Sequence, residues 1–144
     1  MAINKRVLIV EDDIDSLELT ADVLLYEIQN EPRAVIKKID DPAKELRQKG
    51  FDVAQTYSEA EQYIQANDYD YILLDHKMPR AKGEPVESIG YTLIPVIRKK
   101  NPRTIIIGTS SVPDCLLAGL DLPDRHINKI TMELETILRE ILDT

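Results

Sequence analysis

Short, almost wholly apolar runs alternate along the chain with segments whose apolar residues recur every three or four positions. The clearest runs are Val7–Val10, Tyr71–Leu74 and residues 104–107. A strand that is apolar at successive positions suits a parallel sheet covered on both faces. Residues 51–57 alternate more and residues 126–128 are brief, but both segments are typical of strands. We therefore expect five short strands.

Helical spacing predicts how the strands are connected. The first helix is indicated by Leu17, Ala21, Leu24, Leu25 and Ile28. We expect it to end before Pro32. Asp41-Pro42 then reads as a new helix start, with Gly50 as its stop. The stripe formed by Val35, Ile36 and Ile39 either extends the first helix or begins an extra one, and serves either the core or a partner interface.

The second half of the chain shows further helix signals. Ser58 and Glu61 form a Ser-x-x-Glu capping box that opens a helix. Residues 90–100 predict another helix, in which Pro95 marks a kink or a late start. A short helix is expected at residues 113–118, and Thr131 caps the last one. The apolar face of that last helix consists of Leu134, Ile137, Leu138 and Ile141.

Strands that alternate with helices in this way indicate an α/β fold, a doubly wound parallel sheet flanked by helices. The composition is 43% hydrophobic, contains no tryptophan and carries a formal net charge of −8. These values argue against disorder and against direct binding to nucleic acid. Cys115 is the only cysteine, which fits a reducing cytoplasm, and no apolar run is long enough to span a membrane. We expect one cytoplasmic domain that covers residues 1–144.

Chemically active side chains stand where the predicted strands end. They are Glu11, Asp12 and Asp13 after the first strand, Asp75 after the third, Thr109 and Ser110 after the fourth, and Lys129 after the fifth. The carboxyl ends of parallel strands meet at one edge of the sheet, where sites form. Clustered carboxylates need a cation, and Mg²⁺ prefers such oxygen ligands. A carboxylate nucleophile, a metal, a hydroxyl and an ammonium group suit acyl-phosphate chemistry.

Four motifs in this order resemble those of the receiver domains of two-component response regulators, the CheY-like superfamily. They are Val7-Leu8-Ile9-Val10-Glu11-Asp12-Asp13, Tyr71-Ile72-Leu73-Leu74-Asp75-His76-Lys77-Met78-Pro79, Ile105-Ile106-Ile107-Gly108-Thr109-Ser110 and His126-Ile127-Asn128-Lys129. The resemblance implies a five-stranded flavodoxin-like sheet of strand order 2-1-3-4-5. It also implies that the chain carries an insertion between the first helix and the second strand, and an extended loop at residues 80–88.

The resemblance assigns roles at the acidic end of this edge. Asp75 would accept the phosphoryl group. Asp12 would bind Mg²⁺ directly, together with Asp75 and the backbone carbonyl of Lys77, and Glu11 would bind it through water. If the first strand ends one residue later, Asp13 takes a place in the acidic pair.

The resemblance also assigns the groups that respond to phosphorylation. Thr109, with Ser110 beside it, would bind the phosphoryl group, and Lys129 would pair with its oxygens or with Asp75. His126 stands where the family often carries a switching aromatic residue. Ile130 replaces the proline that usually follows the lysine in a cis peptide bond. A non-proline cis bond is unfavourable, so we expect this bond to be either trans, with a different loop, or cis under strain.

The implied partners are a histidine kinase or phosphotransfer protein and an unknown downstream protein. The resemblance also allows a homodimer. The chain would catalyse only its own phosphorylation and dephosphorylation, so we do not expect an enzyme in the wider sense. One alternative is a degenerate receiver that acts as a phosphorylation-independent interaction module. Another is an aspartate-based phosphatase or a flavin protein, but Lys77 stands where such a phosphatase needs a second aspartate.

Overall fold

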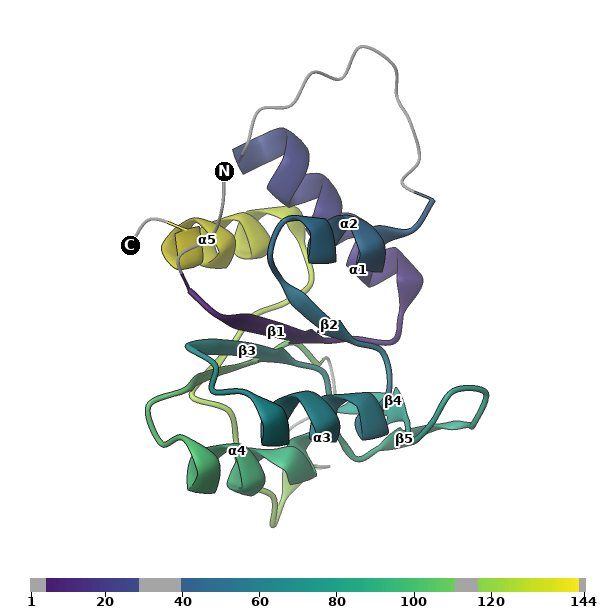
Figure 1. Ribbon diagram of the computed structural model, residues 1–144, viewed down its shortest axis with the longest axis vertical. Helices are drawn as coiled ribbons and strands as arrows, with labels where there is room; N and C mark the ends of the chain where they lie inside the picture. Colours follow the sequence, from purple (N-terminus) through teal and green to yellow (C-terminus); the bar gives the residue numbers. More distant parts are fainter. Residues whose placement is uncertain (1–4, 29–39, 111–116, 143–144) are drawn as a thin grey trace.

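The computed structural model describes residues 5–28, 40–110 and 117–142, in which five parallel strands form one sheet (Figure 1). The strand order is β2-β1-β3-β6-β7. The strands are β1 (Val7–Val10), β2 (Asp52–Ala54), β3 (Tyr71–Leu74), β6 (Ile105–Gly108) and β7 (Arg125–His126). This order confirms the predicted 2-1-3-4-5 arrangement, counted over these five strands. The predicted strands at 51–57, 104–107 and 126–128 all exist with shifted or shortened bounds.

Helices cover both faces of the sheet (Figure 1). One face carries α1 (Ile14–Asp22), which continues as a π-helix (Val23–Ile28), together with α2 (Pro42–Gln48) and α5 (Thr131–Leu142). The other face carries α3 (Tyr57–Ala66), a 3₁₀ turn (Gly90–Leu93) and α4 (Ile94–Lys100). Alternate residues of β1 point into the two cores, as its unbroken apolar run predicts. No helix in the described ranges is both long and apolar enough to cross a bilayer.

The insertion before the second strand contributes α2. Asp41 caps this helix by accepting from the Lys44 N–H at 3.1 Å, and Pro42 stands in its first turn. Gly50 follows with φ of 101°, a conformation that glycine adopts without strain. The predicted start and stop are therefore confirmed. Leu46 is fully buried in the core that α1 also lines, whereas the Val35, Ile36 and Ile39 stripe lies outside the described residues.

Helix α3 begins earlier than the sequence analysis predicts. Thr56 is its N-cap, because the Glu59 N–H donates to the Thr56 hydroxyl at 3.1 Å. The Glu59 carboxylate in turn accepts from the Gln55 N–H at 3.2 Å. The capping box predicted for Ser58 and Glu61 is wrong: the Ser58 N–H and hydroxyl both donate to the Arg80 carbonyl, at 3.0 and 2.8 Å.

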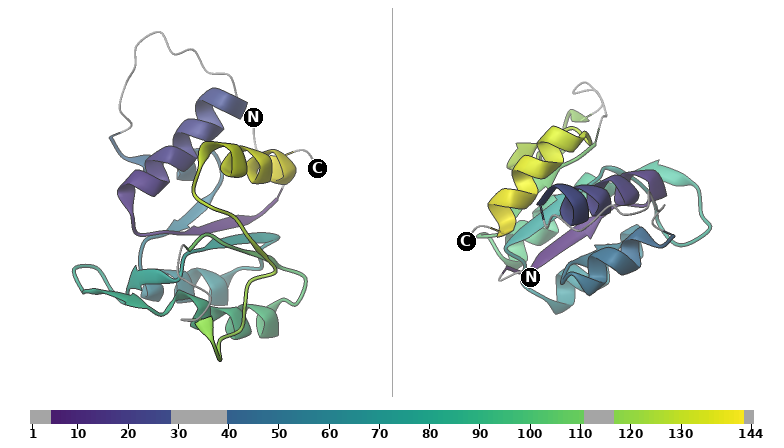
Figure 2. Two further views of the ribbon diagram at one scale, coloured as in Figure 1. Left: turned by 180° about the vertical axis from the view of Figure 1, so that it is seen from behind. Right: turned by 90° about the horizontal axis from the view of Figure 1, so that it is seen from above.

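Residues 80–88, predicted as an extended loop, belong to a β-hairpin that begins at Lys77. Strand β4 (Lys77–Pro79) pairs antiparallel with β5 (Val86–Ser88) and projects from one side of the molecule (Figure 2). The sequence pattern does not indicate this hairpin, because each strand has only three residues and Met78 is the one buried residue among these six. Ser58 connects the hairpin to the start of α3 through the Arg80 carbonyl.

The C-terminal half follows the prediction more closely. The helix expected at 90–100 divides into the 3₁₀ turn and α4, whose first turn contains Pro95, so this proline marks a late start. The predicted apolar face of α5 is buried as expected. Thr131 is the first residue of α5 rather than its cap, since the Ile130 carbonyl accepts the Leu134 N–H at 3.0 Å. The helix predicted at 113–118 lies mostly outside the described residues.

Candidate functional site

Three carboxylates meet where β1 and β3 end. Glu11, Asp12 and Asp75 each offer one carboxylate oxygen, and these oxygens lie within 4.8 Å of one another. Strands β1 and β3 are neighbours in register, with Val10 opposite Leu74, so the residues that follow them are brought together. Glu11 and Asp75 are both 5% exposed, whereas Asp12 is half-buried. Glu11 and Asp75 therefore place two carboxylates in a poorly hydrated corner.

Lys129 reaches this corner from the segment between β7 and α5. Its Nζ lies 3.1 Å from Oδ2 of Asp75 and 2.6 Å from Oε1 of Glu11. Every peptide bond in the described ranges is trans, including that between Lys129 and Ile130. Burial lowers the pKa of Lys129, but the charges and hydrogen bonds of Glu11 and Asp75 outweigh that effect, and the net pKa is raised. The ammonium group therefore stays charged between the two carboxylates.

The lysine does not fully compensate the acidic charge. Burial, together with the charge of Asp75, raises the pKa of Glu11 to about 8 from an ordinary value of 4.5, although Lys129 opposes the shift. Burial also raises the pKa of Asp12. A divalent cation would relieve this repulsion, and the donors present are the hard oxygen ligands that Mg²⁺ prefers. The side chains thus fit a magnesium ion by their chemistry.

Asp13 is placed outside the acidic cluster. Its Oδ2 accepts the Ser16 N–H at 3.1 Å and the Ser16 hydroxyl at 2.7 Å, so that it caps α1. The first strand ends at Val10, and the acidic pair at its end is Glu11 and Asp12. A role for Asp13 in the pair, which would require a longer strand, has no support in this geometry.

Lys77 contributes backbone rather than side chain to this corner. Its N–H donates to Oδ1 of Asp75 over a long 3.4 Å, while its side chain is exposed. In the hairpin Lys77 is opposite Ser88, and the Ile89 N–H bonds to the His76 carbonyl. That pattern makes Lys77–Ser88 a non-hydrogen-bonded pair, so the Lys77 carbonyl points away from β5. The Lys77 carbonyl therefore does not pair with β5.

The hydroxyl residues stand on the next strand. Thr109 follows β6 and donates its N–H to the Leu74 carbonyl at 3.0 Å, beside Asp75. Thr109, Glu11 and Lys129 line a common cavity of about 10 Å³, the size of one water molecule. Ser110 is also buried, and its carbonyl contacts Nε2 of the exposed His126 ring. The structure thus groups Thr109 with the charged cluster and links Ser110 to His126.

Two features near the site are not evident from the sequence pattern. The first is the pair His76 and Tyr91, both 1% exposed, whose rings stack at 4.6 Å between centroids. The second is an open groove of about 590 Å³ between the hairpin, α2 and α3. It is lined by Asp12, Arg47, Gln55, Thr56, Ser58, Glu59, Pro79, Ala81, Lys82 and Gly83.

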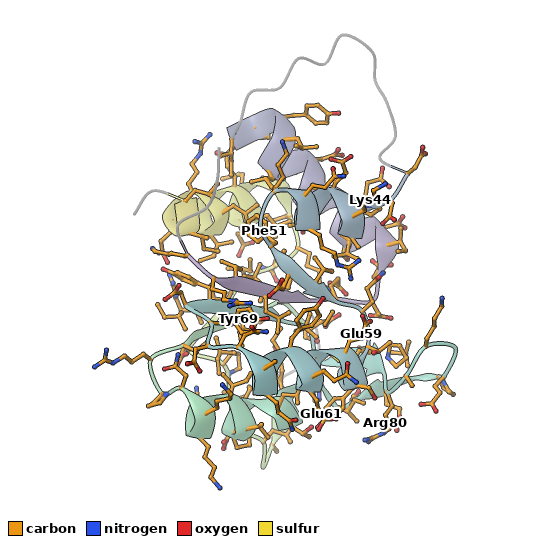
Figure 3. The ribbon with its side chains drawn as sticks, in the orientation of Figure 1. Lys44, Phe51, Glu59, Glu61, Tyr69 and Arg80 are labelled. Carbon is orange, nitrogen blue, oxygen red and sulfur yellow. The ribbon has the colours of Figure 1, made fainter. Side chains whose placement is uncertain are left out.

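The hairpin forms one wall of this groove and is held at its base. The Arg80 guanidinium lies over the Tyr57 ring, 5.3 Å from the centroid. Figure 3 shows Arg80 and Glu59 at the same end of α3. Because Asp12 also lines the groove, the hairpin extends the rim of the acidic corner. The only sequence signal for this wall is the length of the segment between Met78 and Ser88.

Solved structures resemble this chain over nearly its whole length, although no protein-family model and no curated protein matches it. A CheY-like receiver domain from Methanospirillum hungatei JF-1 is 24% identical, with a TM-score of 0.58, over 96% of this chain and 94% of that one. The response regulator TrrA from Thermotoga maritima, solved in complex with Mg²⁺-BeF, is 25% identical, with a TM-score of 0.55, over 96% and 99%. The receiver domain of NtrX from Brucella abortus is 18% identical, with a TM-score of 0.59, over 96% and 98%.

The chain therefore has the fold of the CheY-like response-regulator receiver domains. The resemblance found in its four sequence motifs is confirmed at the level of the fold, in both strand order and coverage. This fold supports a function as a two-component response regulator.

Proposed function

We propose that this chain is a phosphorelay receiver that accepts a phosphoryl group on Asp75 from a histidine kinase or phosphotransfer protein. The observation that carries the proposal is the setting of Asp75, a buried carboxylate that is grouped with Glu11 and Asp12 and pairs with the Lys129 ammonium. If Asp75 were an ordinary turn residue, its burial beside two other carboxylates would cost free energy without a compensating function.

The reaction follows from these groups. An oxygen of Asp75 attacks the phosphorus of the phosphohistidine, and the phosphorus–nitrogen bond breaks with its electron pair going to the nitrogen. The imidazole leaves as the neutral ring, which keeps the proton on its other nitrogen. Glu11, Asp12, Asp75 and the Lys77 carbonyl would hold Mg²⁺, which supplies charge stabilisation to the phosphoryl oxygens. Lys129 already contacts Asp75 and would pair with a phosphoryl oxygen once the acyl phosphate forms.

The response to phosphorylation would start at Thr109. Thr109 lines a cavity with Glu11 and Lys129, and its hydroxyl would bond a phosphoryl oxygen by moving toward Asp75. Ser110 would move with it, and the contact from the Ser110 carbonyl to His126 would transmit the change to the surface. A downstream protein would read that surface, and the acyl phosphate shifts the population between the two arrangements.

Intact-mass spectrometry tests the proposal directly. The protein is incubated with acetyl phosphate, with and without Mg²⁺, beside Asp75→Asn and a control, Asp121→Asn, which alters an exposed aspartate. We expect a phosphoryl mass gain in the wild type and in Asp121→Asn, only with Mg²⁺, and none in Asp75→Asn. No gain in the wild type, or an equal gain in Asp75→Asn, would favour the alternative of a phosphorylation-independent interaction module.

The remaining assignments complete the proposal. We place the protein in the cytoplasm, as one receiver domain over residues 1–144 that catalyses only its own phosphorylation and dephosphorylation. Its partners would be the phosphodonor and a downstream protein, without direct contact to nucleic acid or membrane. The charge of −8 supports this choice because it opposes binding to phosphate backbones.

A further inference from the structure

Tyr91 connects two segments that border the acceptor. It lies in the 3₁₀ turn after the hairpin and is 1% exposed. Its N–H donates to Nδ1 of His76 at 3.0 Å, and the two rings are stacked with a tilt of 35°. His76 directly follows Asp75, and its carbonyl accepts the Ile89 and Gly90 N–H groups at 3.0 and 2.8 Å. One end of Tyr91 is therefore bound to the acceptor segment.

The other end of Tyr91 reaches the hydroxyl-bearing segment. The Ser110 N–H donates to the Tyr91 hydroxyl. The phenol also lies against Gly108, where an added Cβ would be only 2.4 Å from the hydroxyl oxygen. Burial raises the pKa of Tyr91 more than the Ser110 N–H lowers it, so the hydroxyl stays neutral near pH 7. Gly108 provides the room for the contact.

The Ser110 peptide is therefore held on two sides. Tyr91 accepts from its N–H, and the His126 ring contacts its carbonyl. Ser110 directly follows Thr109, whose N–H is bonded to the end of β3. Any movement of Thr109 toward Asp75 must change the contacts of the next peptide. A buried N–H that loses its partner is unfavourable, so Tyr91 opposes that movement.

We propose that Tyr91 is a positioning residue whose hydroxyl holds the Ser110 peptide in the resting arrangement and couples it, through His76, to the acceptor segment. This inference rests on the proposed phosphorylation of Asp75. It adds an internal connection to the surface contact made by His126. Removing the hydroxyl should release Ser110 and make the phosphorylated arrangement easier to reach.

The variant Tyr91→Phe isolates the hydroxyl, because it keeps the buried ring and its stacking on His76. Beryllofluoride with Mg²⁺ serves as the phosphoryl mimic, and amide NMR signals of Thr109 and Ser110 report its binding. We expect the Ser110 amide to shift in the free variant and the mimic to bind about 2- to 10-fold more tightly, the range for one hydrogen bond. Tyr71→Phe is the matched control, because its hydroxyl bonds Glu140 on α5, away from the acceptor.

Each outcome has a distinct meaning. A wild-type protein that does not respond to beryllofluoride overturns both the proposed function and this inference. A wild-type protein that responds, beside a Tyr91→Phe variant with equal or weaker affinity, overturns the inference alone. A tightening that Tyr71→Phe reproduces also overturns it, because the effect would then not belong to the Ser110 contact.

Discussion

The Nζ atom of Lys129 lies 3.1 Å from Oδ2 of Asp75, although the residue after Lys129 is Ile130 and the Lys129–Ile130 peptide bond is trans. A neighbouring contact accounts for this reach. The Glu133 carboxylate, in the first turn of α5, accepts the Asn128 N–H at 3.1 Å and the Asn128 side-chain amide at 3.2 Å. Asn128 is thereby held to the start of α5, which directs the next residue toward the acidic corner.

We expect Lys129→Met to slow phosphorylation of Asp75 by acetyl phosphate by about 100-fold, because one positioned charge that stabilises the transition state is worth that much. Methionine keeps the length of the apolar stem and removes the charge. The rate is measured by intact mass over time at saturating Mg²⁺. The control is Lys99→Met, which changes an exposed lysine on α4. Equal rates for Lys129→Met and the wild type would remove Lys129 from the mechanism.

Glu133 should matter for the same reaction without touching the acceptor. We expect Glu133→Ala to lower the phosphorylation rate by about 10-fold, because Asn128 loses both bonds and Lys129 becomes less well placed. Glu135→Ala is the control, since Glu135 stands two residues further on and pairs with Arg139 on the same helix. In the Lys129→Met background the Glu133 effect should disappear. If Glu133→Ala still lowers the phosphorylation rate in the Lys129→Met background, Glu133 does not act by positioning Lys129.

Much of the site could be predicted from the sequence because it depends on strand ends. The unbroken apolar runs before Glu11 and Asp75 fix where two parallel strands end, and neighbouring parallel strands bring those ends together. The strand order itself follows from the family resemblance, since apolar patterning alone does not specify which strands are neighbours. The α2 helix was predicted for a local reason, the Asp41-Pro42 start.

What the sequence could not provide are features decided by contacts between distant residues. The hairpin strands have three residues each, too few for a periodic pattern. Thr56 and Ser58 are both capable caps, and the choice between them depends on Arg80, whose carbonyl takes the Ser58 donors. The contact of Tyr91 with Ser110 joins residues 19 positions apart in sequence on two separate segments. Such pairs leave no local signal.

Glu11 should make the metal-free protein less stable as the pH rises. Its pKa is about 8 in the folded protein against 4.5 ordinarily, so between these values the folded state binds more protons than the unfolded state, and stability falls with increasing pH. We expect Glu11→Gln to be more stable than the wild type in urea without metal, with a larger difference at pH 8 than at pH 5. Glu84→Gln, at an exposed position of the hairpin, is the control.

The same variant tests the metal site. Mg²⁺ should raise the unfolding temperature of the wild type, because an ion that binds only the folded state stabilises it. The increase should be smaller in Glu11→Gln, which lacks one negative charge. The unfolding temperature should return to its metal-free value when Mg²⁺ is chelated. An unchanged Mg²⁺ response in Glu11→Gln would exclude Glu11 from the binding of the ion.

Glu140 should give the opposite pH dependence at the far end of the sheet. Its carboxylate bonds the Arg125 guanidinium at 2.9 Å and accepts the Tyr71 hydroxyl at 2.9 Å. The Arg125 hydrogen bond lowers the pKa of Glu140 to about 2 from an ordinary 4.5. The stabilisation is therefore present above about pH 4.5 and is lost as the pH falls toward about 2.

Glu140→Gln measures this contribution. Its side chain is 44% exposed, so solvent screening limits the stabilisation to about 1 kcal/mol. In urea titrations we expect the wild type to exceed the variant by about that amount at pH 6, and the difference to shrink progressively on acidification. Glu135→Gln, which disrupts an exposed pair within α5, should show a smaller difference because that pair is a single contact between side chains of one helix. A Glu140→Gln difference that stays constant between pH 6 and pH 3 would show that the Arg125 pair does not shift this carboxylate.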